Sequence, residues 1–156
     1  MRNANGDILK FIEIDRYAQK RAWVIIPTNG FVKRNSRAVM GKGLAKQVSM
    51  KFQKLPLQLG QRLSVHGNHV FKFQEYGIIT FPVKTNWFEN ASLDLIENSL
   101  KELVPIIEAN PEDNFYIPRV GCGNGKLNWN FVEPIVEQHL QKFDNVILVH
   151  YTGWEN

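Results

Sequence analysis

The sequence predicts an α/β sandwich whose central sheet is mixed. Short, continuously apolar runs, typical of strands buried on both faces, alternate with longer segments whose apolar residues recur at helical spacing. Strand–helix–strand units of this kind join parallel strands, so much of the sheet should be parallel. The middle of the chain instead carries short apolar runs separated by glycine-containing turns, as in a hairpin, which adds an antiparallel pair.

The first third of the chain contains two predicted strands and one predicted helix. Residues 7–14 alternate loosely between polar and apolar side chains, which predicts a strand, and Ala22–Pro27 (AWVIIP) reads as a buried central strand. A polar loop follows over Asn29–Arg37. The next apolar residues are spaced by four, four and three, which predicts a helix that ends at Pro56. These residues are Leu44, Val48, Phe52 and Leu55.

The middle of the chain contains three short predicted strands and a long predicted helix. Glycine and asparagine residues separate the strands as turns. The helix has one apolar face and should be kinked by Pro105. The strands are Leu63–Val65, Val70–Phe73 and Tyr76–Phe81, and the apolar helix face consists of Ile96, Leu100, Leu103, Val104 and Ile107.

The last third of the chain contains two predicted strands and one predicted helix. The strand Phe115–Val120 runs directly into a glycine-rich segment, and the strand Asn145–Tyr151 is apolar enough to be buried. The helix between them carries its apolar residues on one face. That face consists of Val132, Ile135, Val136, Leu140 and Phe143.

The composition indicates one folded domain over residues 1–156. Apolar residues of the set AVILMFWYC make up 44% of the chain and charged residues 22%, which excludes a disordered or fibrous protein. No apolar run approaches the roughly 20 residues that cross a bilayer, and the first residues lack the apolar core of a signal peptide. The single Cys122 cannot form an internal disulfide. We therefore expect a monomer of the cytoplasm, away from membranes, with no metal site and no cofactor.

Two glycine-rich segments lie where α/β folds usually bind ligands. Five of the eleven glycines fall in VMGKGLAKQ, at the start of a predicted helix, and in RVGCGNGKL, directly after a buried strand. Glycine lets successive backbone N–H groups point at a ligand, and such nests and helix N-termini hold phosphate. Two such loops suit a diphosphate, and the net charge of +4 favours an anion, although two ordinary tight turns remain the alternative. Neither segment has the spacing of a P-loop or of a dinucleotide-binding fingerprint.

Five sequence blocks occur in an order that resembles a known family. They are GDI (Gly6–Ile8), PTNG (Pro27–Gly30), AVMGKGLAKQ (Ala38–Gln47), FPVKTNW (Phe81–Trp87) and IPRVGCGNGKLNW (Ile117–Trp129). Together they resemble macrodomains, the ADP-ribose-binding fold. They are most similar to the branch that holds antitoxin macrodomains, which remove ADP-ribose from DNA, and glycohydrolases of ADP-ribosylated glutamate. The resemblance implies a three-layer α/β/α sandwich with a mixed sheet of six or seven strands.

The resemblance also implies which residues bind the adenosine and the ribose. Asp7 would accept a hydrogen bond from the adenine amino group, with Ile8 beside the base. Asn29 would position the hydroxyls of the distal ribose, next to Gly30 of the same block. As alternatives, Asp7 is a turn or cap residue and Asn29 is a turn-forming asparagine before glycine.

The two glycine-rich segments would hold the diphosphate from both sides. The first would line the diphosphate and the distal ribose, and the second would close over the opposite side. Cys122 then resembles a small loop residue rather than a nucleophile. The residues of the first segment are Met40, Gly41, Lys42, Gly43 and Leu44, and those of the second are Gly121, Cys122, Gly123, Asn124 and Gly125.

Lys84 is the main catalytic candidate, because in the family branch a lysine of this block faces the distal ribose. A lysine amine near C1 of the ribose either forms a transient Schiff base with the opened sugar or stabilises the leaving group electrostatically. The first route requires a lowered lysine pKa, and hence partial burial or a nearby cation. As the alternative, Lys84 is a solvated lysine just past a strand.

The sequence departs from the family pattern in two places. The glutamate-directed glycohydrolases carry an aspartate in the second glycine loop, at the position where this chain has Gly125. The DNA-directed type also has glycine there. The loop of this chain therefore supplies no general base. Glu89 and Asp94 are alternative bases, although both read as surface residues at a helix start. The inserted loop Phe31–Arg37 carries three cations for phosphates of a nucleic acid or of ADP-ribose, or is simply solvated. These cations are Lys33, Arg34 and Arg37.

The predicted function is a metal-independent hydrolase that releases ADP-ribose from a modified target, with DNA or RNA preferred to protein. Lys84 would act on the distal ribose, and Asn29 would position it. A phosphatase acting on ADP-ribose 1″-phosphate and a non-catalytic ADP-ribose reader are the alternatives. A nucleic-acid-binding domain without an ADP-ribose site is the remotest one.

Overall fold

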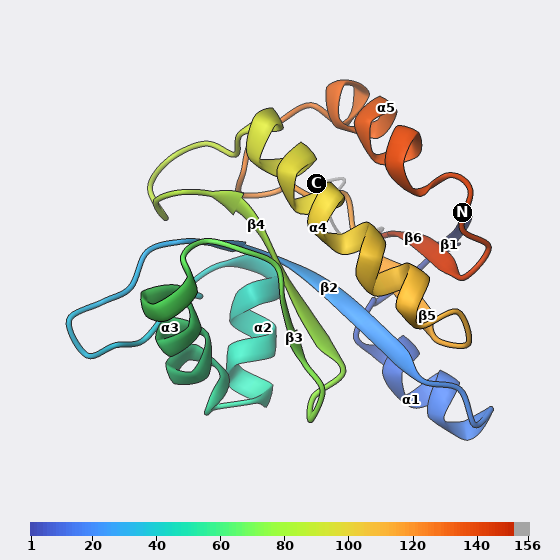
Figure 1. The fold of residues 1–156 in the computed structure, drawn as a ribbon, viewed down its shortest axis with the longest axis horizontal. Helices are drawn as coiled ribbons and strands as arrows, with labels where there is room; N and C mark the ends of the chain where they lie inside the picture. The colour runs from blue at the N-terminus through green and yellow to red at the C-terminus, as the bar shows by residue number, and fades with distance from the viewer. Residues whose placement is uncertain (152–156) are drawn as a thin grey trace.

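A six-stranded mixed sheet forms the centre of the structure, a computed structural model that describes residues 1–151 (Figure 1). The strand order is β1-β6-β5-β2-β4-β3, and every neighbouring pair is parallel except β3 with β4. The predicted mixed α/β sandwich is therefore confirmed, with six strands. These are β1 (Arg2–Asn5), β2 (Ala22–Asn29), β3 (Phe71–Phe73), β4 (Ile78–Lys84), β5 (Asn114–Ile117) and β6 (Val146–His150).

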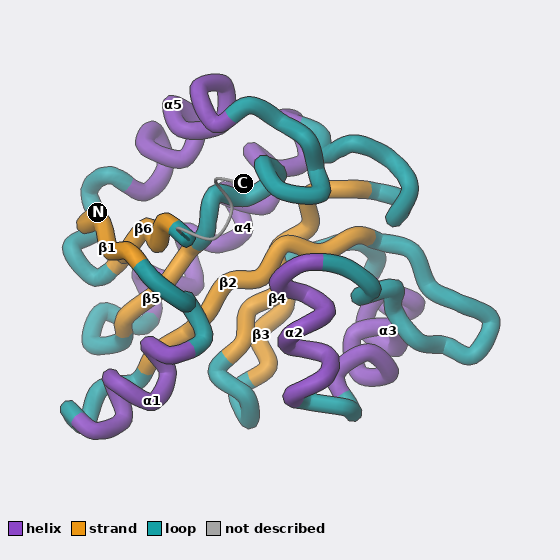
Figure 2. The backbone as a smooth tube through the Cα atoms, turned by 180° about the vertical axis from the view of Figure 1, so that it is seen from behind, coloured by secondary structure: helices purple, strands orange, loops and turns teal. Residues whose placement is uncertain are grey.

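Five helices cover the two faces of the sheet, as seen from both sides in Figures 1 and 2. Helices α4 and α5 pack on one face, and α1, α2 and α3 on the other, because successive strand residues point in opposite directions. Along β2, Trp23 and Ile25 belong to the core under α4 and α5, whereas Val24 and Ile26 belong to the other core. The helices are α1 (Lys10–Tyr17), α2 (Gly43–Lys51), α3 (Leu55–His66), α4 (Leu93–Ala109) and α5 (Trp129–Leu140).

The prediction of a strand over residues 7–14 is wrong. The edge strand lies earlier, as β1, and residues 10–17 form α1. Phe11 and Ile12 pack on the second core, and the ring of Phe11 stacks on Tyr116 with centroids 4.6 Å apart. The buried Asp15, one turn further on, accepts a 2.7 Å hydrogen bond from the Tyr116 hydroxyl. In so short a segment the helical and strand periods fit equally well, and the tertiary contacts decide between them.

The helix expected to end at Pro56 is two helices, and the strand expected at Leu63–Val65 lies within the second. Helix α2 ends at Lys51, and Pro56 lies in the first turn of α3. Proline is tolerated there because its missing N–H has no helical partner in any case. Leu55, Leu59 and Leu63 of α3 are buried at a spacing of four, which gives the helix its core-facing stripe.

The remaining elements lie close to their predicted positions. Strand β4 begins later than expected and extends to Lys84, while β5 ends at Ile117, short of the predicted Val120. Helix α4 runs through Pro105, and α5 ends before Phe143. Within residues 1–151 no helix is both long enough and apolar enough to cross a membrane. Residues 152–156 of the expected domain lie outside the described residues.

Helix α3 crosses the loop after β2 at very close range. A Cβ atom built on Gly60 would lie 1.9 Å from the carbonyl oxygen of Ser36, so the contact requires glycine. The backbone N–H of Ala38 also donates to the carbonyl of Pro56 at 2.9 Å. The first turns of α3 therefore anchor the loop that returns from β2 to α2.

We predict that Gly60→Ala lowers the free energy of unfolding by about 1–3 kcal/mol, because the added methyl pushes the loop backbone away. Urea unfolding followed by circular dichroism measures the effect. Gln61→Ala, at an exposed position one residue further along α3, serves as the control and should change stability little. A Gly60→Ala protein as stable as the wild type would contradict the close contact.

Candidate active site

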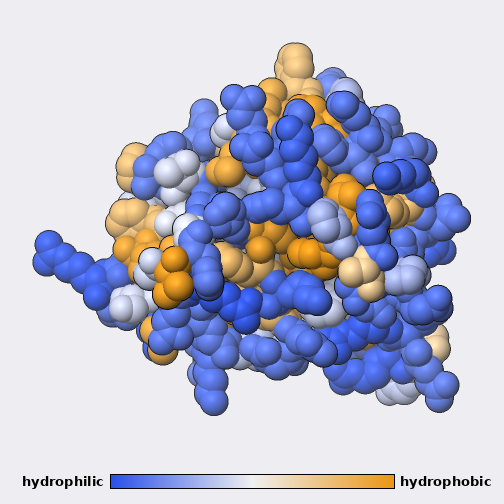
Figure 3. Space-filling model, viewed as in Figure 1, coloured by the Kyte–Doolittle hydropathy of each residue, from blue (hydrophilic) through white to orange (hydrophobic). Residues whose placement is uncertain are grey.

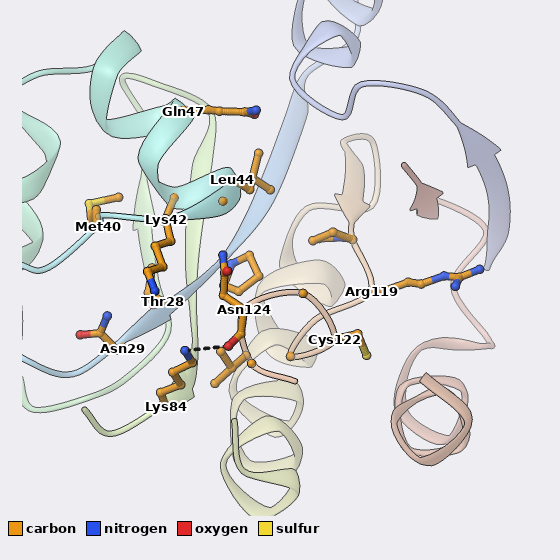
Figure 4. Close-up of a pocket in the computed structure, with 18 of the residues that line it drawn as sticks. Thr28, Asn29, Met40, Lys42, Leu44, Gln47, Lys84, Arg119, Cys122 and Asn124 are labelled. Carbon is orange, nitrogen blue, oxygen red and sulfur yellow. Dashed lines mark hydrogen bonds between the residues drawn. The ribbon is translucent and has the colours of Figure 1, made fainter. Parts of the chain in front are cut away.

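A cavity of about 1180 Å³ opens at the carboxyl ends of the parallel strands (Figure 4). Its walls are the segments that follow β1, β2, β4, β5 and β6, together with the start of α2. This is the edge of an open α/β sheet where ligands bind. Every residue expected to contact ADP-ribose lines the cavity except Gly30, which lies behind the wall. The lining members are Asp7, Ile8, Asn29, Met40, Gly41, Lys42, Gly43, Leu44, Lys84, Gly121, Cys122, Gly123, Asn124 and Gly125.

The first glycine segment presents the N-terminus of α2 to the cavity. Gly43, Leu44 and Ala45 form the first turn of the helix and line the wall, and no side chain caps this turn. Its backbone N–H groups have no partner within the helix, and the helix dipole adds positive potential. This end of the cavity is therefore suited to an anion such as phosphate.

The second glycine segment is a tight loop that packs against the loop before α4. The N–H groups of Lys126 and Leu127 donate back to the carbonyls of Gly123 and Gly121, at 3.0 and 2.9 Å. A Cβ atom at Gly125 would lie 2.5 Å from the Gly121 oxygen and 2.7 Å from the Ala91 Cβ. No side chain fits at position 125, so an acid there requires a differently built loop.

Lys84 lies between the two glycine segments, at the end of β4. Its Nζ donates a 3.2 Å hydrogen bond to the carbonyl oxygen of Asn124, a contact across 40 residues of sequence (Figure 4). Partial burial lowers the pKa of this amine, and the positive charges of Lys42 and Lys126 lower it further. The neutral amine is therefore more populated here than on a solvated lysine.

A local irregularity in the β2–β4 ladder turns Lys84 toward the cavity. Thr28 pairs with Pro82, but Asn29 pairs with Lys84, so Val83 is the extra residue of a bulge. The freed Lys84 carbonyl accepts a 3.1 Å hydrogen bond from Nδ2 of Asn68, in the loop before β3. Bulges of this kind re-aim a side chain, and here the side chain is the candidate catalytic amine.

Gly30 and Asn68 form a close contact behind this bulge. A Cβ atom at Gly30 would lie 2.7 Å from Cγ of Asn68, so the Asn68 side chain covers this side of Gly30. Asn68 reads as a turn residue in the sequence, and no local pattern marks it as a support for Lys84. Its role is visible only when α3, β2 and β4 are brought together.

The side chain of Asn29 forms hydrogen bonds with the backbone of the loop that follows it. Its Nδ2 donates to the carbonyl of Val39 at 3.0 Å, and its Oδ1 accepts from the N–H of Phe31 at 3.0 Å. The side chain thus closes the loop between β2 and α2 while it lines the cavity. One Nδ2 hydrogen and one lone pair of Oδ1 remain for a ligand.

One carboxylate oxygen of Asp7 stabilises a turn, and the other is available to a ligand. Its Oδ1 accepts a 3.1 Å hydrogen bond from the N–H of Leu9, while Oδ2 has no partner within residues 1–151. Asp7 is also the only carboxylate among the lining residues of the described chain. Glu89 and Asp94, the alternative bases, do not line the cavity; Glu89 instead accepts a hydrogen bond from Asn86.

The cavity wall carries more cations than carboxylates. Lys33, Lys42, Lys84 and Arg119 line it, against the single acidic Asp7. Sequence reasoning missed Arg119, although the residue stands directly before the second glycine segment. The excess of cations makes an anionic ligand the natural occupant.

Arg119 is held in place at the β1 edge of the cavity. Its Nε donates to Nδ1 of His150 at 3.0 Å, and Nε2 of His150 lies 2.8 Å from Oδ1 of Asn3. Burial and the Arg119 charge lower the pKa of His150, while Glu133 opposes them. His150 is therefore neutral with its proton on Nε2, and the guanidinium lies 5.6 Å from the Trp129 ring centre.

Cys122 carries a neutral thiol. Burial raises its pKa to about 11, although the Arg119 charge acts in the opposite direction. The Sγ atom contacts the carbonyl oxygen of Val120 at 3.5 Å. Since the thiolate is the nucleophile, this environment does not activate the side chain.

Several curated proteins resemble the chain over most of its length. A DNA ADP-ribosyl glycohydrolase of Thermus aquaticus is 29% identical in an alignment of 133 residues, which covers 78% of this chain and 36% of that protein. A DNA ADP-ribosyl glycohydrolase of Mycobacterium tuberculosis is 27% identical in an alignment of 128 residues, which covers 75% of this chain. The chain thus spans only 36% of the length of these two relatives. No family model matches the sequence.

Solved structures decide the fold. The macrodomain of DarG from Mycobacterium tuberculosis superposes with a TM-score of 0.74 at 25% identity, over 96% of this chain and 95% of that one. The chain has the macrodomain fold. DarTG of Thermosipho africanus, solved in complex with ADP-ribose, matches the macrodomain with the same TM-score of 0.74 and 19% identity, over 97% of this chain and 42% of that one. The macrodomain fold expected from the five sequence blocks is confirmed, and these similar proteins come from the DNA-directed branch that the blocks resemble.

We predict that Gly30 and Asn68 are energetically coupled. Gly30→Ala alone should lower the free energy of unfolding by about 1–3 kcal/mol, because the methyl meets the Asn68 side chain. In an Asn68→Ala background the same change should cost much less, since the obstructing side chain is gone. Urea unfolding of the two single variants and the double variant measures the coupling. Equal costs of Gly30→Ala in both backgrounds would contradict the contact.

Proposed function

We propose that this macrodomain binds ADP-ribose and hydrolyses the bond that joins it to a modified base in DNA. One observation carries the proposal: a lysine of lowered pKa, Lys84, is held between two amide-lined loops in a positively charged cavity. The names of the relatives, DNA ADP-ribosyl glycohydrolases, support this substrate, although the chain spans 36% of their length.

The cavity offers a separate group for each part of ADP-ribose. The first turn of α2 and the loop 121–125 supply backbone N–H groups for the diphosphate. Asp7 has a free carboxylate oxygen for the adenine amino group, beside the buried Ile8. Asn29 and Lys84 lie at the other end, where the distal ribose would be placed. In this arrangement C1 of the ribose faces the Lys84 amine.

The amine can act on that carbon in a covalent route. The neutral amine attacks C1 of the opened ribose, the target base leaves with a proton, and a lysine imine remains. Water then hydrolyses the imine, which returns the amine and free ADP-ribose. The lowered pKa of Lys84 favours this route, because it increases the fraction of neutral amine. In the electrostatic route the charged lysine instead stabilises the departing group.

A non-catalytic ADP-ribose reader is the second candidate function. The observation in its favour is the absence of any carboxylate other than Asp7 on the described cavity wall, together with the lack of space at Gly125. A reader would bind ADP-ribose tightly and leave every ADP-ribosylated substrate intact. Parallel binding and hydrolysis measurements on the wild-type protein separate the two functions.

We predict that Lys84→Ala reduces turnover of ADP-ribosylated DNA by about a hundredfold or more, because it removes the amine at the reacting carbon. Thermal stabilisation by free ADP-ribose should persist, since the diphosphate and adenine contacts remain. Lys46→Ala, an exposed cation of α2 outside the cavity, is the matched control and should turn over normally. Unchanged turnover in Lys84→Ala would remove this residue from the mechanism.

We predict that turnover rises with pH and levels off below the ordinary lysine pKa of 10.5, because the neutral amine is the active form. Lys84→Arg stays charged throughout this range and should therefore be inactive at every pH. Rates of release of ADP-ribose from modified DNA, measured from neutral to alkaline pH, give the profile. A rate that falls as the pH rises, with partial activity in Lys84→Arg, would replace the covalent route with the electrostatic one.

A further inference from the structure

The loop between β2 and α2 forms an arm that projects from the body of the protein (Figure 1). We call residues 31–37 the basic arm. Val32 and Ala38 form a β-bridge at its base, and the N–H of Lys33 donates to the carbonyl of Arg37 at 2.8 Å. The tip is closed by the N–H of Ser36, which donates to the Lys33 carbonyl at 2.9 Å, and α3 packs against the Ser36 carbonyl through Gly60. The arm is therefore held in place before any ligand binds.

The arm presents three cations with nothing to neutralise them. Lys33, Arg34 and Arg37 are exposed, and none of their side chains makes a hydrogen bond or ion pair within residues 1–151. By contrast, Arg62 in α3 packs on the ring of Phe73 and donates to a backbone carbonyl. Hydrophilic side chains extend from the left edge of the surface in Figure 3, where Figure 1 places the arm. Three like charges on one short turn repel each other, and the binding of phosphate groups would reduce this repulsion.

Exposed aromatic rings follow β4, which neighbours β2 in the sheet. Trp87 and Phe88 follow β4 and form an edge-to-face pair with ring centres 5.5 Å apart, although they are 49% and 66% exposed. Phe31, at the base of the arm, is 36% exposed. Solvent-exposed aromatic rings beside a cavity are candidates for stacking with a ligand.

The base of the arm and Trp87 border the cavity just past the paired ends of β2 and β4, where Asn29 lies opposite Lys84. Phe31, Lys33 and Trp87 line it together with Asn29 and Lys84. A nucleic-acid strand that carries ADP-ribose into the cavity would therefore pass both the cations of the arm and these aromatic rings. Alternation of phosphates and stackable faces is the chemistry of a nucleic-acid strand.

We propose that the basic arm and the Trp87–Phe88 pair form a docking surface for single-stranded DNA, which holds the strand on either side of the modified base. This inference rests on the proposed function and names the form of its substrate. Unpaired bases offer free faces to aromatic side chains, whereas the bases of a duplex are already stacked. The backbone phosphates meet the arm and need no particular sequence.

The test measures binding of an unmodified, fluorescein-labelled single-stranded DNA of about 12 nucleotides by anisotropy at several salt concentrations. Arg34→Ala/Arg37→Ala should raise the dissociation constant about tenfold and make the salt dependence shallower by about 1.4 in log–log slope, for two lost phosphate contacts. ADP-ribose affinity by calorimetry should not change, because neither arginine lines the cavity. Arg16→Ala/Lys142→Ala removes the same charge outside the cavity and should leave DNA affinity nearly intact.

Three outcomes would overturn the docking surface. The first is equal loss of DNA affinity in the two double variants, which indicates a general charge effect. The second is a loss of ADP-ribose affinity in Arg34→Ala/Arg37→Ala, which assigns the arm to the ADP-ribose site itself. The third is a duplex of the same length that binds as tightly as the single strand.

The aromatic half of the surface is tested by Trp87→Ala and Trp87→Phe. The alanine variant should bind the single strand about tenfold more weakly, and the phenylalanine variant should retain most of the affinity because it keeps a stacking ring. Equal affinity in both variants would overturn the stacking role. A wild-type protein that binds the strand but leaves ADP-ribosylated DNA intact would refute the proposed function and support the docking surface.

Discussion

The parallel pairing of β2 with β4 is the constraint on which the rest of the structure depends. Residues from both strands are buried on both faces of the sheet, with Val24, Ile25 and Ile79 fully inaccessible to solvent. A slip of one residue would exchange the two core faces, so packing specifies the register strongly. The same register brings the ends of both strands to one edge, with Asn29 opposite Lys84. The position of the candidate catalytic amine is therefore a consequence of core packing.

The cavity concentrates positive charge and has few acids. Lys84 is partly buried with Lys42 and Lys126 nearby, an arrangement that disfavours its charged form. The glycine segments add backbone N–H groups, and α2 adds its dipole. Because Gly125 leaves no space for a carboxylate, Asp7 is the only carboxylate on the described cavity wall. These features together favour an anionic ligand.

Most of the fold follows from apolar patterns that admit a single interpretation. The run Ala22–Pro27 is too short and too apolar for a surface helix, and α4 repeats its apolar face over 17 residues. The wrong secondary-structure predictions concern segments whose sequence pattern fits two different structures. Residues 7–14 suit a strand or a helix, and Pro56 suits the end of one helix or the first turn of the next. Contacts with Tyr116 and the core beneath α3 decide these cases.

The sequence by itself determined the chemistry available to this protein: the glycines where amides must approach a ligand, the lysine at a strand end, the cations of the basic arm and the five blocks that mark a macrodomain. The tertiary structure alone decided how that chemistry is arranged. The bulge that turns Lys84, its hydrogen bond to the Asn124 carbonyl and its support by Asn68 all join residues far apart in the chain. Local spacing carries no information about such contacts, because they arise only when separate elements pack on the same sheet.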